Sequence, residues 1–130
     1  SIPVGTYPQE MTLAPSKNYL FVTCTEDASN PLPGRSGSVY VIDYTPPAHI
    51  VKVLYGDFYQ PHGVAVDEQN GLIYIPSRNA NPLGPAPHHA TACGGRAGWY
   101  SVYNLNTLEP ADSKRYQVTV DPYTIATRFK

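Results

Sequence analysis

A segment of about 50 to 60 residues occurs twice in this 130-residue chain and begins a third time. The copies open at Pro8, Pro61 and Pro122, a spacing slightly longer than the roughly 40 to 50 residues of a four-stranded repeat. The middle of the segment also recurs, since Asn-Pro-Leu appears at 30–32 and 81–83. Self-similarity at such a period indicates that the chain folds as successive copies of one supersecondary unit.

Each copy contains four short runs rich in β-branched and aromatic residues, separated by polar or proline-containing turns. Such runs predict strands, and Asn70-Gly71 between two of them is a strong hairpin signal. The strands expected in the first copy are residues 11–14, 19–24, 38–44 and 49–55. Those expected in the second copy are residues 63–67, 72–75, 99–105 and 115–120. Residues 2–4 and 123–127 are expected to be strands of the neighbouring copies.

Turn-forming residues interrupt the chain too often for long helices. There are 14 Pro and 10 Gly, and proline cannot continue a helix. Eleven Tyr and many β-branched residues supply enough apolar surface for a core, which argues against disorder. Only 15% of the residues are charged, in keeping with strands buried between neighbouring units. The composition therefore predicts an all-β protein with almost no helix.

Charge and hydropathy exclude two classes of partner. The net charge is −1 and neither sign is clustered, so the basic footprint of a nucleic-acid-binding protein is missing. No apolar run approaches the roughly 18 residues of a membrane span. Because the chain opens on Ser-Ile-Pro without Met, we expect either a processed protein or a piece of a longer one. A disulfide between Cys24 and Cys93 would indicate an oxidising compartment, and two free thiols are the alternative.

Three strand sequences carry a family pattern. They are Val-Ala-Val at 64–66, Leu-Ile-Tyr-Ile at 72–75 and Val-Tyr-Val-Ile-Asp at 39–43, with a loop Gly and Pro before the first. This pattern resembles the YVTN-type β-propeller repeat, and the resemblance covers nearly the whole chain. The sequence departs from the pattern at Glu10-Met11-Thr12 and at Pro76. The chain is also similar to exported bacterial propeller proteins that carry a Pro-His-His…Cys-Gly-Gly loop.

The resemblance implies a partial β-propeller of two four-stranded antiparallel blades plus one extra strand. Residues 7–55 would form the first blade, residues 61–121 the second, and residues 122–128 the inner strand of a further blade. A propeller closes a ring of roughly four to eight blades, so two blades leave apolar faces uncovered. The expected partners are the remaining blades, in the same chain or in another one, or further copies of this chain. The resemblance also implies export to the periplasm or the cell exterior.

Four side chains able to bind a metal ion fall in loops at one end of the second copy. His62 enters the inner strand, whereas His88, His89 and Cys93 lie in the long insertion 79–98. Imidazole and thiolate groups suit zinc or copper. The alternative interpretation makes the histidines ordinary polar loop residues, with His62 hydrogen-bonded where the strand begins. Together with Arg96, the three histidines are candidates for a ligand-binding face.

Enzyme motifs are scarce. His62 and Asp67 stand at opposite ends of one expected strand, roughly 16 Å apart. Glu10 and Asp57 are further candidates for a catalytic role at the end that carries the long loops. Spacing identifies no catalytic partner for either. Asp43 and Asn104 end equivalent strands, which favours turn capping. Arg35 and Arg96 recur at matching positions, which favours bracing of a loop.

Two functions of different classes are consistent with these observations. The first is a non-enzymatic propeller scaffold or binding module of an exported protein, which recognises a protein partner through long loops on one face. The second is a propeller subunit of a metal- or cofactor-dependent redox assembly, with His62, His88, His89 and Cys93 near the channel. A metal or cofactor that copurifies with the protein would favour the second function over the first.

Overall fold

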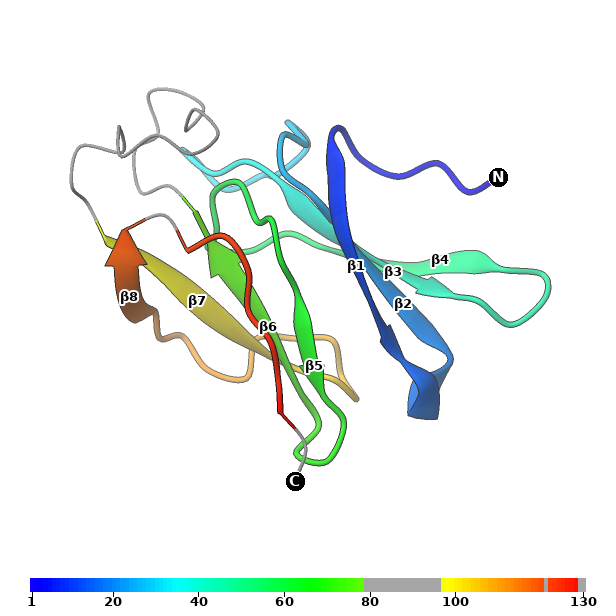
Figure 1. The fold of residues 1–130 in the computed structure, drawn as a ribbon. Helices are drawn as coiled ribbons and strands as arrows, with labels where there is room; N and C mark the ends of the chain where they lie inside the picture. The colour runs from blue at the N-terminus through cyan, green and yellow to red at the C-terminus, as the bar shows by residue number, and fades with distance from the viewer. Residues whose placement is uncertain (79–96, 121, 129–130) are drawn as a thin grey trace.

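Two four-stranded antiparallel sheets make up this structure, a computed structural model that describes residues 1–78, 97–120 and 122–128 (Figure 1). In each sheet the strands follow one another in chain order. The first sheet consists of β1 (Pro8–Ala14), β2 (Tyr19–Cys24), β3 (Ser38–Asp43) and β4 (His49–Leu54). The second consists of β5 (Ala65–Asp67), β6 (Leu72–Ser77), β7 (Ala97–Asn104) and β8 (Tyr116–Val120). The only helical element among the described residues is a 3-10 turn, η1 (Pro15–Lys17).

The prediction of an all-β chain with two four-stranded antiparallel units is confirmed. The eight strands lie where the repeat predicts them, and β2 has the predicted bounds. β6 continues past its predicted end at residue 75, because Pro76 pairs with Tyr100 of β7. On its other side β6 pairs with β5 only up to Tyr74. Pro76 therefore occupies a stretch where β6 is an edge strand, a position that tolerates the missing N–H group.

The strand expected near the C-terminus is not formed. Residues 122–128 lie along β5, where the Gly63 amide donates to the Tyr123 carbonyl at 3.1 Å and the Thr127 hydroxyl donates to the Val66 carbonyl at 2.8 Å (Figure 1). These isolated bonds do not make a ladder. Residues 2–4 are likewise not a strand. A strand needs a row of backbone hydrogen bonds to its partner, and one of the two bonds that join residues 122–128 to the β5 segment comes from a side chain.

The core lies between the two sheets, where buried apolar side chains interlock. The first sheet contributes Ala14, Phe21, Val39, Val41 and Leu54, and the β4–β5 connection and the second sheet with its loops contribute Phe58, Val64, Val66, Ile73, Ile75, Tyr103, Leu105 and Leu108. Each fully buried aliphatic or aromatic side chain contributes about 1.5 to 3 kcal/mol. The two sheets are thus held together mainly by apolar burial.

Hydrogen bonds fix how the sheets sit on one another. The Thr12 hydroxyl donates to the Val64 carbonyl at 2.8 Å. The Thr23 hydroxyl donates to the His62 carbonyl at 2.5 Å. Both bonds join the first sheet to the segment that enters β5. They fix the position of the first sheet relative to the start of β5, because each joins a side chain of β1 or β2 to the backbone just before β5.

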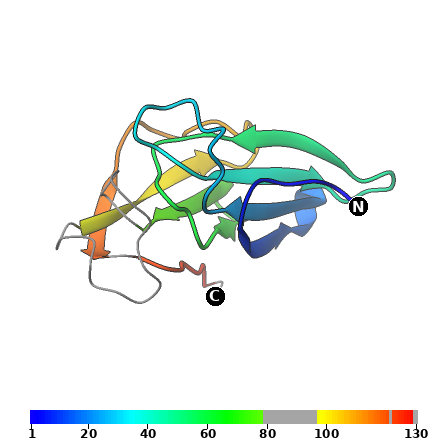
Figure 2. The same ribbon diagram turned by 90° about the horizontal axis from the view of Figure 1, so that it is seen from above.

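The two sheets lie side by side in Figure 1, with β1 and β5 facing one another. The N-terminus lies beside the first sheet, on the side away from the second sheet (Figures 1 and 2). There Ile2 and Val4 pack against Val22, Cys24 and Ile42 in a second, smaller apolar cluster. Among the described residues, no helix has the length and apolar character needed to cross a membrane.

We predict that Phe21→Ala lowers the free energy of unfolding by about 3 to 5 kcal/mol, because it leaves a cavity between the sheets. Phe21 is fully buried. The matched control is Val51→Thr on β4, where the side chain is exposed and a change within about 0.5 kcal/mol is expected. Chemical denaturation of both variants measures the difference. Equal effects would mean that the sheets do not depend on this contact.

Candidate functional site

His62 lies in the connection between β4 and β5, with its side chain buried near the start of β5. Its ring packs against Tyr123, with the ring centres 3.6 Å apart and the planes tilted by 33°. Its Nδ1 atom lies 4.0 Å from a carboxylate oxygen of Glu10 on β1. His62 therefore joins residues of three segments that are distant in the sequence.

The groups around His62 form a polar cluster. Thr124 donates its hydroxyl to the Glu10 carboxylate, at 3.2 Å and 3.4 Å from the two oxygens. The Arg78 guanidinium lies 5.1 Å from the centre of the Tyr123 ring. We call Glu10, His62, Arg78, Tyr123 and Thr124 the His62 cluster. Imidazole, carboxylate, hydroxyl and guanidinium groups together can bind a polar ligand at this end of the sheets.

Asp67 does not join the His62 cluster. Its carboxylate instead closes the turn between β5 and β6, where it accepts hydrogen bonds from the Asn70 amide at 3.0 Å and from the Asn70 side chain at 2.7 Å. Asp43 and Asn104 cap turns as predicted. Asp43 accepts from the Thr45 amide at 2.7 Å, and the side-chain oxygen of Asn104 accepts from the Asn106 amide at 2.8 Å.

The other predicted site residues, His88, His89, Cys93 and Arg96, lie outside the described residues. The zinc or copper site built from His62, His88, His89 and Cys93 therefore stays a prediction. Within residues 1–78, 97–120 and 122–128, no three His, Cys, Asp or Glu side chains are grouped so that they could hold a metal ion.

Cys24, at the end of β2, is buried and forms no disulfide within the described residues. Burial raises its pKa above the ordinary value of a thiol, and the nearby Asp27 carboxylate acts in the same direction. A raised pKa keeps the sulfur protonated and poorly nucleophilic. Because its predicted disulfide partner Cys93 lies outside the described residues, the pairing stays a prediction.

A second cluster of charged and aromatic side chains centres on Asp57, in the same β4–β5 connection. The Arg35 Nε atom donates to the Asp57 carboxylate at 2.6 Å, and Arg115 donates to both of its oxygens, with Nη2 2.7 Å from Oδ1. Trp99 on β7 donates its indole N–H to the Asp57 carbonyl at 2.6 Å. We call Arg35, Asp57, Trp99 and Arg115 the Asp57 cluster.

Both arginines of the Asp57 cluster approach the indole ring of Trp99. The Arg35 guanidinium carbon is 5.7 Å from the ring centre and that of Arg115 is 4.7 Å away. Cations at such distances are attracted to the face of an indole ring. The cluster therefore ties the β2–β3 connection, the β4–β5 connection and the start of β8 to one another.

Asp57 is ionised in this environment. Partial burial raises the pKa of the carboxyl, but the hydrogen bonds from Arg115 and Arg35 outweigh that effect, so the pKa lies below its ordinary value. Its charge is thus compensated by two guanidinium groups. A carboxylate held in this way positions loops and does not accept protons near neutral pH.

In the structure, the candidate residues Glu10, Asp57 and Arg35 have side-chain partners that their spacing in the sequence could not identify. Arg35 braces its loop as predicted, through Asp57. Sequence reasoning missed the contributions of Arg78, Arg115 and Thr124. The sequence predicts Arg115 at the start of a strand, and no periodic feature distinguishes an arginine that bonds a distant carboxylate from one that faces solvent.

Comparison with known proteins adds no further constraint: no protein-family model, no curated protein and no solved structure matches this chain.

We predict that Asp57→Asn destabilises the protein by about 1 to 2 kcal/mol at neutral pH, because two charged hydrogen bonds are weakened in a partly solvent-screened position. The matched control is Lys52→Met, which removes one exposed contact with Glu109 and is expected to cost about 0.5 kcal/mol or less. Thermal unfolding of both variants measures the difference.

The effect of Asp57→Asn should depend on pH. Because the pKa of Asp57 is lowered in the folded state, its stabilisation is fully present above the ordinary carboxyl pKa of about 3.9 and is lost as pH falls through the lower, folded value. The stability difference between the native protein and the variant should therefore shrink in acid. A difference that stays constant from pH 7 to strongly acidic conditions would contradict this assignment.

Proposed function

We propose that the two sheets are consecutive blades of a β-propeller and that this protein is a non-enzymatic scaffold or binding module. The observation that supports this most strongly is the unequal burial of two equivalent residue pairs. Leu13 of β1 pairs with Leu20 of β2, and Val66 of β5 pairs with Ile73 of β6. Val66 is 4% exposed because the first sheet covers it, whereas Leu13 is 54% exposed.

The strand register makes these pairs equivalent. Tyr19 opposes Asp43 in the first sheet, and Leu72 opposes Asn104 in the second. Leu20 therefore corresponds to Ile73, the next residue along the strand. The face of the second sheet that packs against the first sheet thus has a counterpart on the first sheet that points away from the second. A preceding sheet of the same kind would cover it.

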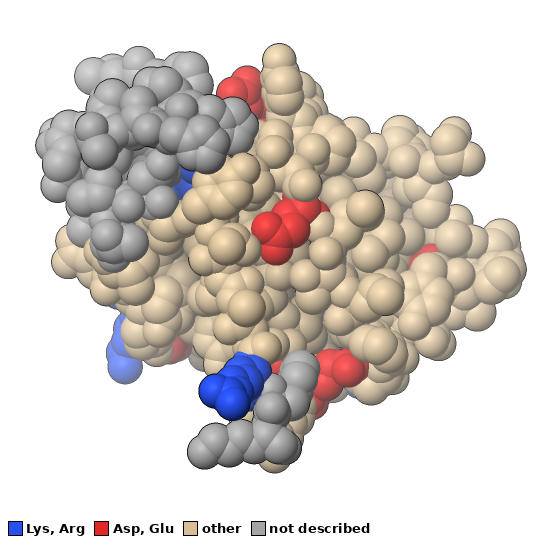
Figure 3. All heavy atoms as spheres, viewed as in Figure 1, with Lys and Arg blue, Asp and Glu red and all other residues tan. Residues whose placement is uncertain are grey.

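The outer face of the first sheet is apolar, and Ile2 and Val4 cover only part of it. A groove of about 600 Å³ runs over it, lined in part by Met11, Leu20, Val22 and Ile42. Met11 is 65% exposed. The part of the surface over the first sheet is almost free of charged side chains in Figure 3. Exposed apolar patches of this size are typical of interaction surfaces.

The opposite face of the second sheet is also suited to a neighbour. Tyr100 stacks on Tyr116 with ring centres 5.0 Å apart, and Tyr74 meets Tyr100 edge-on at 6.0 Å. By the same register, Tyr74 corresponds to Phe21, which is buried between the two sheets. A following sheet would therefore pack on these tyrosines as the second sheet packs on Phe21. The occupants we propose for both faces are further sheets of the same repeat.

The connections at one end of the sheets supply the proposed recognition surface. The β2–β3 and β4–β5 connections meet there, since the Gln60 amide donates to the Ser36 carbonyl at 3.2 Å. The Asp57 cluster anchors both connections to the second sheet. Loops held on a rigid scaffold commonly carry recognition, and the compensated charge of Asp57 favours binding over acid-base chemistry. We propose a protein partner for this face and an exported location for the protein.

We predict that Leu13→Glu disrupts the natural assembly while leaving the fold of the two-sheet unit unchanged, because the new charge would be buried only when a further sheet covers this face. The intact mass of the natural polypeptide or of its assembly should exceed 14.2 kDa. In thermal unfolding of the natural form, Leu13→Glu should lower the unfolding temperature. The control Lys17→Glu, in the exposed turn between β1 and β2, should have little effect.

Either of two results would overturn the assignment of further sheets. One is a natural protein that is a stable 14.2 kDa monomer. The other is equal tolerance of Leu13→Glu and Lys17→Glu in the natural form. For the recognition surface, we expect His62→Ala to change the dissociation constant for the protein partner. We expect the native protein to have no catalytic activity that this substitution could reduce.

We predict that the natural protein is found in the periplasmic or extracellular fraction of its cells. Fractionation followed by mass spectrometry of the natural polypeptide tests this. Recovery in the cytoplasmic fraction alone would contradict export and leave the assignment of the sheets untouched, since sheet packing does not depend on the compartment.

A further inference from the structure

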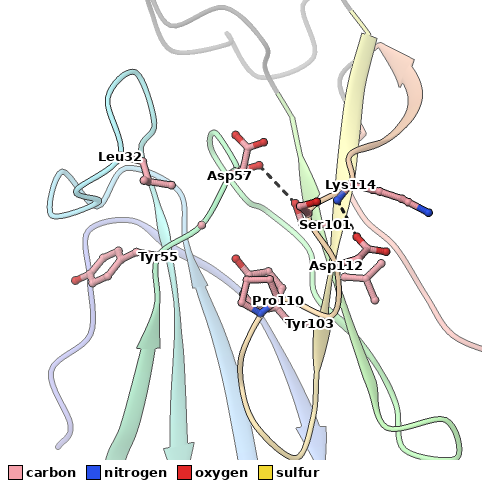
Figure 4. Close-up of a pocket in the computed structure, with 11 residues that line it drawn as sticks. Leu32, Tyr55, Asp57, Ser101, Tyr103, Pro110, Asp112 and Lys114 are labelled. Atoms are coloured by element: carbon pink, nitrogen blue, oxygen red, sulfur yellow. Dashed lines mark hydrogen bonds between the residues drawn. The ribbon is translucent and has the colours of Figure 1, made fainter.

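A cavity of about 440 Å³ opens between the two sheets on the side of the β4–β5 connection (Figure 4). Leu32 and Tyr55 line it from the first sheet and its loops, and Ser101, Tyr103 and Pro110 line it from the second. Its size lies within the range of sites that bind small molecules. This cavity is separate from the His62 cluster, which shares no residue with it.

The Tyr103 hydroxyl lies at the wall of this cavity without a hydrogen-bond partner among the described residues. The side chain is only 3% exposed, with its ring packed in the core between the sheets. In Figure 4 the phenol points from β7 toward the first sheet and the Tyr55–Asp57 segment. Because the hydroxyl borders the cavity, a ligand bound there can accept a hydrogen bond from it.

The Tyr103 hydroxyl is a hydrogen-bond donor at neutral pH. Burial, together with the carboxylates of Asp57 and Glu109, raises the pKa of Tyr103 to about 12. Gly56 makes room for it, because a Cβ atom at that position would collide with the hydroxyl oxygen. Only glycine at position 56 leaves room for the protonated Tyr103 hydroxyl. A ligand in the cavity would accept a hydrogen bond from this hydroxyl.

The walls of the cavity are held in place by contacts already formed. The Asn30 side chain donates to the Gly56 carbonyl at 3.3 Å, and Trp99 donates to the Asp57 carbonyl at 2.6 Å. These bonds fix the backbone on one side of the cavity, and the core fixes Tyr103 on the other. Little conformational entropy is therefore lost when a ligand binds.

The two carboxylates at the cavity wall are compensated. Asp57 is bonded by two arginines, and Asp112 accepts hydrogen bonds from the Tyr116 hydroxyl at 2.6 Å and from the Lys114 amide at 2.8 Å. Lys114 directs its ammonium group away from Tyr103 in Figure 4. The ligand therefore needs no net charge. It needs groups that both accept and donate, because hydroxyls and carboxylate oxygens line the same space.

We propose that this cavity binds a neutral, hydroxyl-rich small molecule of about monosaccharide size, with the Tyr103 hydroxyl donating a hydrogen bond to it. The cavity lies between the two sheets whether or not further sheets extend the assembly. The proposal is therefore independent of the proposed function, and each can fail without the other.

Trp99 provides the measurement, because it is the single tryptophan of the chain and bonds to Asp57 at the cavity wall. We expect titration of the full chain with D-glucose to change the tryptophan fluorescence in a saturable way. Glucosamine and glucuronic acid, which carry opposite charges on the same ring, should bind more weakly. Tyr103→Phe should weaken glucose binding by about fivefold or more, the effect of one lost hydrogen bond.

Two further variants separate binding from folding. Tyr44→Phe removes an exposed phenol that does not line the cavity and should leave the affinity unchanged. Leu32→Tyr enlarges a half-exposed side chain at the cavity mouth without touching the core, and it should weaken binding even if Tyr103→Phe does not fold. No saturable change with any of the three sugars would overturn the proposal. So would unchanged glucose affinity in folded Tyr103→Phe or in Leu32→Tyr, or tighter binding of a charged sugar.

Discussion

The apolar contact between the two sheets is the interaction on which the rest of the structure depends. Phe21, Val39 and Val41 on one side meet Ile73 and Ile75 on the other, all of them fully buried. Both the His62 cluster and the cavity beside Tyr103 join residues from each half of the chain. Neither arrangement would exist in one sheet alone, so separation of the sheets would abolish both at once.

Much of the architecture could be predicted from the repeat. The strand order and the bounds of β2 follow from alternating runs between turn signals, because local sequence decides both. The turn capping by Asp43 and Asn104 could be predicted for the same reason. The strand expected at 123–127 is not formed, since a strand also requires regular backbone pairing with a distant partner, which local sequence does not reveal.

The candidate sites were harder to predict because their partners are distant in the sequence. His62 was found from its place before an inner strand, but its contact with Glu10 bridges 52 positions. The bond between Arg115 and Asp57 bridges 58. The cavity depends on Gly56 and Tyr103, a glycine and an aromatic residue of ordinary type. Only their approach in space distinguishes them, since neither has a motif.

The equivalent faces of the two sheets differ in burial, and this difference determines how further copies could be added. The uncovered face of the first sheet is equivalent to the covered face of the second, so the contact joins unlike surfaces and has a direction. A head-to-tail contact of this kind never satisfies itself in a symmetric pair, and it ends only when the rotation per unit closes a circle. Where closure fails, the same surfaces would add copy after copy into an open filament, and the exposed Leu13 and Met11 would form its growing end.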